Sequence, residues 1–70
     1  MRKMTKEERN ALRLVRMWAQ KATQTINDGL NANDVTVCDY ELIITAADKM
    51  AEHVRRALKI VLRYDNSNDR

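Results

Sequence analysis

Proline and phenylalanine are absent from this chain, and glycine, cysteine and histidine each occur once in its 70 residues. A β-sandwich or β-barrel needs many turn-forming and β-forming residues, so this composition excludes both. One cysteine excludes an internal disulfide framework. One cysteine with one histidine cannot make a Cys/His zinc site. The chain is also about half as long as a typical domain, so we expect one domain at most.

Long hydrophobic runs are also missing. The longest aliphatic runs, at 42–44 and 60–62, are three residues each, whereas a membrane span needs about 20. The first residues contain no apolar secretory segment, and with a lone Cys38 this predicts a cytoplasmic protein. Charged residues make up 33% and hydrophobic residues 44% of the sequence, a balance typical of a folded rather than a disordered chain.

Apolar side chains recur at helical spacing in the first half of the chain and predict a helix over about 5–29. Thr5 followed three residues later by Glu8 forms a capping-box pattern at its start. Gly29 and Asn31 are candidates for the left-handed residue that ends it. The expected apolar face consists of Ala11, Leu12, Val15, Trp18, Ala19, Ala22, Ile26 and Leu30.

Polar turn formers follow, so we expect a turn at about 30–36 and a second helix at about 37–64. Thr36 followed by Asp39 repeats the capping-box spacing, and residues 65–70 are expected to form a frayed tail. The β-formers from Val35 to Ile44 leave open a short strand at 35–38. The main apolar row of the second helix contains Ile43, Ala47, Met50, Val54, Ala57, Val61 and Tyr64, beside a second row of Tyr40, Ile44, Ala51 and Leu58.

The predicted fold is all-α, an antiparallel helical hairpin that forms one domain over residues 1–64. Both helices carry apolar faces wider than one helix–helix seam can cover. A chain this short seldom builds a sufficient core alone, so we predict a homodimer, most simply a four-helix bundle. The expected core and interface residues are Val15, Trp18, Ala22, Ile26, Ile43, Ala47, Met50, Val54 and Val61.

Charge is segregated along the sequence, although the net charge is only +3. Residues 22–48 contain five acids and no Lys or Arg, while 1–21 and 49–64 together contain twelve bases and three acids. A hairpin therefore places the bases at one end and the acids at the turn end. This arrangement complements helix macrodipoles and favours two hairpins packed with their turns at opposite ends. Alternatively, the basic end is a docking surface for an anion.

A basic row on the first helix supports the anion-binding alternative. Lys6, Arg9, Arg13 and Arg16 fall within about 80° of one another, opposite the apolar face. Guanidinium groups suit phosphate recognition because their donors are planar and bidentate, although an ordinary solvated face has the same pattern. On the second helix, Glu52 is spaced to pair with Arg56. The second basic row consists of Arg56, Lys59 and Arg63.

Residues with catalytic potential are few and scattered. Trp18 is expected to be a core or subunit-contact anchor, and His53 a partly exposed structural residue. Cys38 has no base placed beside it by the sequence. The chain contains no Gly-rich phosphate loop and no metal-ligand motif. We therefore predict a protein that is not an enzyme and that uses no cofactor or metal.

The stretch Met4-Thr5-Lys6-x-Glu8-x-x-Ala11-Leu12-x-x-x-Arg16, about 13 of the 70 residues, resembles the opening of the Rop family. The resemblance implies a helical hairpin that dimerises into a four-helix bundle and binds paired RNA loops along the first helix. Lys6 agrees with the family's RNA-facing row, whereas Met17 stands where the family stacks a phenylalanine. Separately, Arg16-Met17-Trp18-Ala19 followed by Ala22 resembles a helix in small phage proteins that sequester cyclic oligonucleotide signals.

Three functions remain open from the sequence. The first is a small regulatory module that presents its basic helix face to RNA or another polyanion. The second is a phage or mobile-element interaction protein that binds and inhibits a host protein. The third is a sequestering receptor for a small anionic nucleotide at a subunit interface. All three act by binding, and all expect the chain to associate with itself and not with a membrane.

Overall fold

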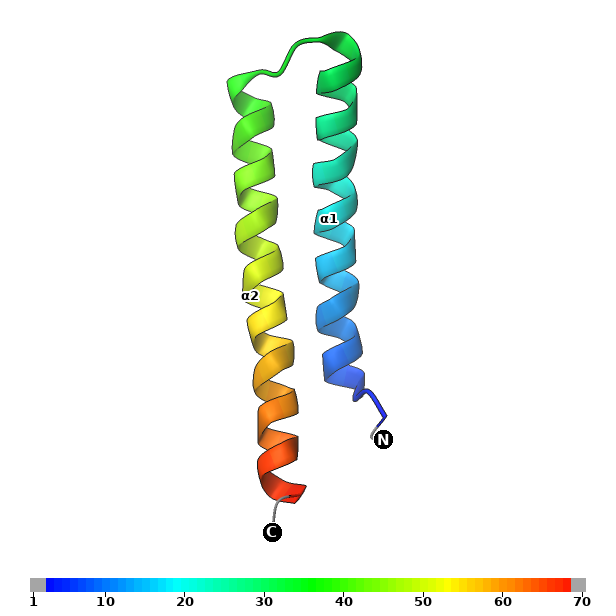
Figure 1. Cartoon of the computed structure of the whole chain (residues 1–70), viewed down its shortest axis with the longest axis vertical. Helices are drawn as coiled ribbons and strands as arrows, with labels where there is room; N and C mark the ends of the chain where they lie inside the picture. The colour runs from blue at the N-terminus through cyan, green and yellow to red at the C-terminus, as the bar shows by residue number, and fades with distance from the viewer. Residues whose placement is uncertain (1–2, 69–70) are drawn as a thin grey trace.

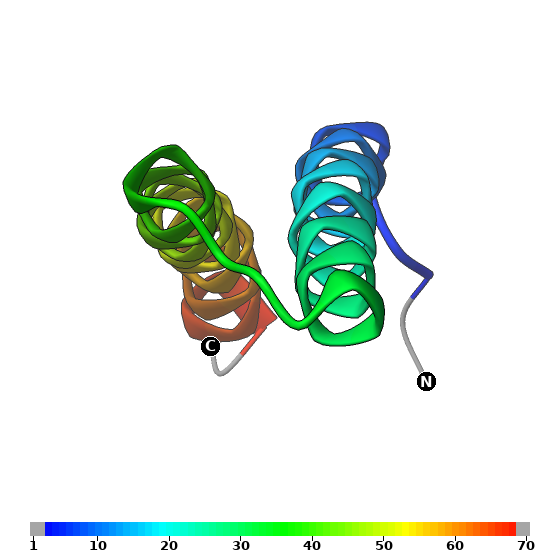
Figure 2. The ribbon, with the colours of Figure 1, turned by 90° about the horizontal axis from the view of Figure 1, so that it is seen from above.

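The computed structural model describes residues 3–68, and the side chains of residues 3–63. Two helices, α1 (Lys6–Ala32) and α2 (Val37–Asn68), are joined by residues 33–36. The helices are antiparallel and lie side by side, so the start of α1 is near the end of α2 (Figures 1 and 2). The predicted all-α hairpin is confirmed. Its Cα atoms span 55 × 17 × 14 Å.

Both predicted capping boxes are formed. At the start of α1, the Glu8 amide donates to Thr5 Oγ1 at 3.0 Å, and the Thr5 amide donates to Glu8 Oε1 at 3.3 Å. At the start of α2, the Asp39 amide donates to Thr36 Oγ1 and the Thr36 amide donates to Asp39 Oδ2, both at 3.1 Å. These bonds satisfy amides that have no partner within the helix, and they fix where each helix begins.

α1 ends later than the sequence indicated. The left-handed residue is Asn33, with φ of 54°, rather than Gly29 or Asn31. The Asn33 amide donates to the Leu30 carbonyl at 3.3 Å, and the Asp34 amide donates to the Gly29 carbonyl at 3.0 Å. This is a Schellman arrangement, which satisfies the last carbonyls of the helix. Asparagine tolerates the left-handed conformation better than most residues, so the helix continues for three residues beyond residue 29.

Gly29 is a buried residue within α1 and has a negative φ. A methyl group at this position would lie 2.6 Å from Cγ2 of Val35 and 3.5 Å from the Asp34 carbonyl oxygen. The glycine therefore permits the connection to pass directly over the last turns of α1. Its role is close approach and not chain reversal, which explains why the expectation of a left-handed Gly29 was wrong.

The alternative of a strand at 35–38 is also wrong. Val35 and Thr36 belong to the connection, and α2 begins at Val37 with the capping box already described. At the other end, α2 continues to Asn68, so residues 65–68 are helical where a tail was expected. Extending an existing helix adds one backbone hydrogen bond per residue. Residues 69 and 70 lie outside the described residues.

The seam between the helices is built on alanine. The buried hydrophobic residues of the described chain are Ala11, Ala22, Ala46 and Ala57, and none of its large side chains is fully buried. Counted from residue 34, Ala11 and Ala57 are each 23 residues away, and Ala22 and Ala46 are each 12 away. The alanines thus fall at matching levels, where small side chains let two helices approach closely.

The complete seam repeats every seven residues, with steps of three and four. Such a repeat keeps one stripe of each helix against its neighbour. Every seam residue is buried or half-buried: Glu8, Ala11, Val15, Trp18, Ala22, Thr25 and Gly29 on α1, and Asp39, Ile43, Ala46, Met50, His53, Ala57 and Ile60 on α2.

The main apolar row expected on α2 therefore combines two faces. Ile43, Met50 and Ala57 lie in the seam, whereas Ala47 and Val54 are exposed. Val61 is half-buried, and the side chain of Tyr64 lies outside the described side chains. On α1, Val15, Trp18 and Ala22 lie in the seam as expected, whereas Ile26 is 41% exposed. The sequence favoured the more hydrophobic row because Ala46 and His53 add little apolar signal.

The remaining apolar residues of α2 form what we call the outer apolar row. It has the same spacing as the seam, and its large side chains are 46–72% exposed where values are resolved: Val37, Tyr40, Ile44, Val54 and Leu58. A shorter row on α1 has Leu12 at 38% and Ile26 at 41% exposure, with Ala19 between them. The full outer apolar row is Val37, Tyr40, Ile44, Ala47, Ala51, Val54, Leu58 and Val61.

Candidate functional site

The basic row of α1 lies on the side of the helix that faces away from α2. Lys6, Arg9, Arg13 and Arg16 are all exposed. The three arginines surround one shallow hollow of about 410 Å³, whose other lining residues are Met4 and Leu12. The helical spacing predicted from the sequence thus gathers three guanidinium groups around a single surface depression.

The basic residues of α2 lie elsewhere. Arg56 and Lys59 line a hollow of about 360 Å³ together with Glu52 and Arg55. Arg56 also borders a groove of about 400 Å³ between the helices, where its α1 neighbours are Glu7, Asn10 and Leu14. Arg63 is exposed near the end of the described side chains. The two predicted basic rows are therefore not joined in these hollows, each of which takes its basic side chains from one helix.

The local contacts of Arg56 also differ from the expectation. Its Nη2 atom lies 2.9 Å from Nδ1 of His53, and because a guanidinium can only donate, the imidazole nitrogen accepts. Glu52 instead makes an exposed ion pair with Lys49, at 3.9 Å between Nζ and Oε2. Arg56 is thus held against the helix seam by a half-buried histidine, whereas the arginines of α1 project into solvent.

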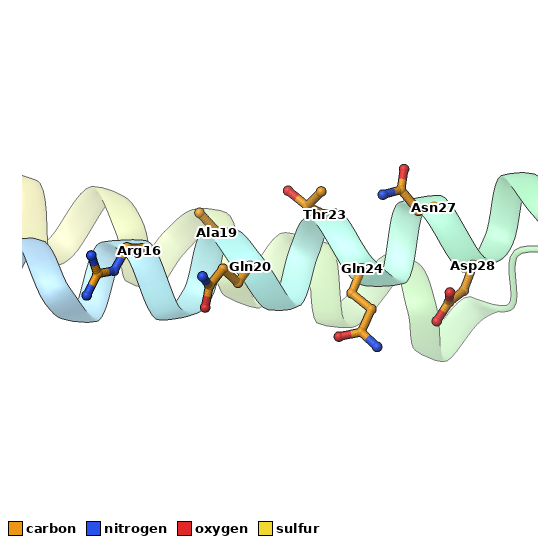
Figure 3. Close-up of a pocket in the computed structure, with 7 residues that line it drawn as sticks. All are labelled: Arg16, Ala19, Gln20, Thr23, Gln24, Asn27 and Asp28. Atoms are coloured by element: carbon orange, nitrogen blue, oxygen red, sulfur yellow. The ribbon is translucent and has the colours of Figure 1, made fainter.

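A second surface on α1 continues from the basic row toward the turn and carries mostly uncharged polar groups. Its hollow of about 420 Å³ begins at Arg16 and ends at Asp28 (Figure 3). All of the labelled side chains come from one helix, and they project from it on either side of the ribbon. Sequence reasoning extended the basic row only to Gln20. The wider amide-rich surface comprises Gln20, Thr23, Gln24 and Asn27.

The remaining candidates for chemistry stand apart from one another. Trp18 is half-buried in the seam, with Nζ of Lys21 5.0 Å from its ring centroid, a cation–π contact. Cys38 is a free, exposed thiol near the start of α2. In the described part of the chain, no three His, Cys, Asp or Glu residues are placed to hold a metal ion. Across the described residues, neither helix has a stretch long and apolar enough to cross a membrane.

Exposed arginines in a shallow hollow can donate paired hydrogen bonds to phosphate or carboxylate oxygens. Amides beside them can both donate and accept, so they suit nucleotide bases or peptide groups. The site's chemistry is therefore that of anion binding through an open surface. Comparison with family models, curated proteins and solved structures finds no match to this chain.

Proposed function

We propose that this protein is a small, non-enzymatic binding module that acts as a dimer and presents the basic row of α1 to RNA or another polyanion. The observation that carries the proposal is the single hollow lined by Arg9, Arg13 and Arg16. Three exposed guanidinium groups at this spacing can contact successive phosphates, and neutralising phosphates releases counterions from the nucleic acid. The exposed thiol of Cys38 suits the reducing cytoplasm, where we propose that the module acts.

Dimerisation is supported by what the hairpin leaves uncovered. Its buried hydrophobic residues in the described chain are alanines only, while Ile44, Leu58 and other large side chains remain more than half exposed. A chain of this size seldom builds a stable core without a disulfide, a metal or a partner. Covering these side chains with a second subunit would supply the missing apolar burial. The α1 basic row projects from the outward side of its helix and stays available for binding.

Salt-dependent binding tests the polyanion proposal. The measurement is fluorescence anisotropy of a labelled RNA hairpin titrated with protein at several salt concentrations between 50 and 200 mM. The triple variant Arg9→Gln, Arg13→Gln, Arg16→Gln should weaken binding by at least about tenfold, and each lost phosphate contact should reduce the log–log salt slope by about 0.9. Wild-type affinity that is absent, or flat with salt, would contradict the proposal.

The matched control removes the same charge from another surface. Arg55→Gln, Arg56→Gln and Lys59→Gln together line the hollow on α2, so this triple variant should weaken binding by less than the α1 variant does. Equal losses would show that net charge, and not the α1 row, governs binding. Specific capture of one protein without RNA affinity would favour the host-protein function. Thermal stabilisation by cyclic nucleotides alone would favour the nucleotide receptor.

A further inference from the structure

We infer that the outer apolar row of α2, together with Leu12, Ala19 and Ile26 of α1, is the surface on which a second copy of this chain packs, with the two turns at opposite ends. The inference rests on the dimerisation within the proposed function and adds to it the interface and its direction. The outer row continues without a polar interruption from Val37 to Val61, although at least five of its side chains are exposed.

The two apolar rows lie on one side of the hairpin. The groove lined by Leu14 of α1 and Arg56 of α2 marks the other side of the seam. At 100° per residue, Leu12 lies about 160° around the α1 axis from Leu14, and Val54 lies about 160° around the α2 axis from Arg56. Both helices therefore turn their outer rows toward the face opposite this groove, where they form one continuous apolar surface.

The apolar surface is suited to pairing with itself. The row on α1 is centred on Ala19, and the row on α2 is centred on residue 49, between Ala47 and Ala51. Both centres lie 15 residues from residue 34, so they are at the same level of the hairpin. A two-fold axis through this level places each row on its own copy. Alanines then meet at the centre, and the larger side chains pack toward the ends.

The dimensions agree with a stable interface. The outer row extends over 24 residue steps, or about 36 Å, and the Cα atoms of the hairpin span 17 Å in width. The projected area is about 600 Å² per subunit, which reaches the lower end of standard specific interfaces. A parallel helix pair would cover the same length, so area alone does not choose the direction.

Charge complementarity selects the antiparallel direction. Asp28, Asp39 and Glu41 lie five to seven residues from residue 34, whereas Arg9 and Lys59 both lie 25 residues away. A two-fold axis at level 15 brings levels 5 and 25 together, so the acidic turn end of one copy faces the basic open end of the other. In a parallel pair, acids would face acids and bases would face bases, which disfavours association.

The free thiol of Cys38 allows the direction to be measured on the wild-type chain. Spin labels attached to Cys38 are read by pulsed dipolar spectroscopy without added RNA. The antiparallel dimer places the two labelled positions about 33 Å apart along the helix axis. A parallel pair brings them within about 20 Å, since packed helices lie ~8–10 Å apart. The longer distance supports the inference, whereas the shorter distance overturns it.

A mutant pair tests the face separately from the direction. Ile44→Lys places a charge on the outer apolar row, and the dimer should weaken by about 30-fold or more, a loss typical of an interface hot spot. The matched control is Met17→Lys, because Met17 is also exposed (39%) but projects from the outward side of α1. It should dimerise like the wild type. An Ile44→Lys dimer of wild-type affinity, or equal weakening by both variants, overturns the assignment of the face.

These outcomes remain separate from the polyanion experiment. A dimer with the predicted Cys38 distance that does not bind RNA contradicts the proposed polyanion function and leaves the interface intact. RNA binding by a chain with a short Cys38 distance, or with no dipolar coupling, overturns the interface and leaves the basic row in place. The wild-type distance also keeps the test decisive if Ile44→Lys does not fold.

Discussion

Gly29 of α1 and Val35 of the connection are in such close contact that a methyl group on Gly29 would lie 2.6 Å from Cγ2 of Val35. Two effects of opposite sign follow for Gly29→Ala. Alanine is favoured over glycine within a helix by about 1 kcal/mol, but overpacking a close contact costs about 1–3 kcal/mol. Because valine is stiff about χ1, the steric effect should be the larger of the two.

We therefore expect Gly29→Ala to lower the free energy of unfolding by about 1 kcal/mol in the wild-type background. In a Val35→Ala background, the same change should instead raise it by about 0.5–1 kcal/mol, since the obstructing methyl is gone. Urea denaturation followed by circular dichroism at one fixed protein concentration measures all four variants. The same sign in both backgrounds would contradict the close contact.

A second prediction concerns the left-handed residue at the end of α1. Asn33 has φ of 54°, a conformation that glycine adopts without steric cost. Asn33→Gly should therefore leave stability unchanged or raise it by about 0.5 kcal/mol. Asn31→Gly is the matched control, because residue 31 is helical and glycine there should cost about 0.5 kcal/mol. Thermal melts would contradict this assignment if the two variants ranked in the opposite order.

The alanine seam gives a third prediction. Ala46 is 0% exposed, so Ala46→Leu must separate the helices or distort their packing, and it should lower stability by about 1–3 kcal/mol. Thr45→Leu, at the exposed neighbouring position, should change stability by less than about 0.5 kcal/mol. Denaturant unfolding of the two variants compares the sites directly. Equal effects would show that Ala46 does not lie in the seam.

The helices themselves could be predicted from local sequence. Thr5 with Glu8 and Thr36 with Asp39 fixed both helix starts, because a capping box depends only on residues three apart. The basic row on α1 was equally predictable, since side chains at helical spacing must share a face. The end of α1 was not, because it depends on how closely Val35 packs over Gly29, a contact that lies outside helical periodicity.

The face that α2 turns toward α1 was also beyond the sequence pattern. Steps of three and four connect Ile43 to Met50 through either Ala46 or Ala47, so periodicity permits both rows. Hydrophobicity favoured the row through Val54, and the structure places the row through His53 in the seam. Close helix approach at small side chains decided the packing, and it left the more hydrophobic row outside.

Sedimentation equilibrium of the wild-type chain at micromolar concentration tests the central claim, that a second copy covers the outer apolar row. The predicted result is a folded, helical species with twice the 8.2 kDa mass of the chain. A folded helical species at 8.2 kDa across that concentration range would contradict the account, because the exposed side chains of α2 would then be stable without a partner subunit.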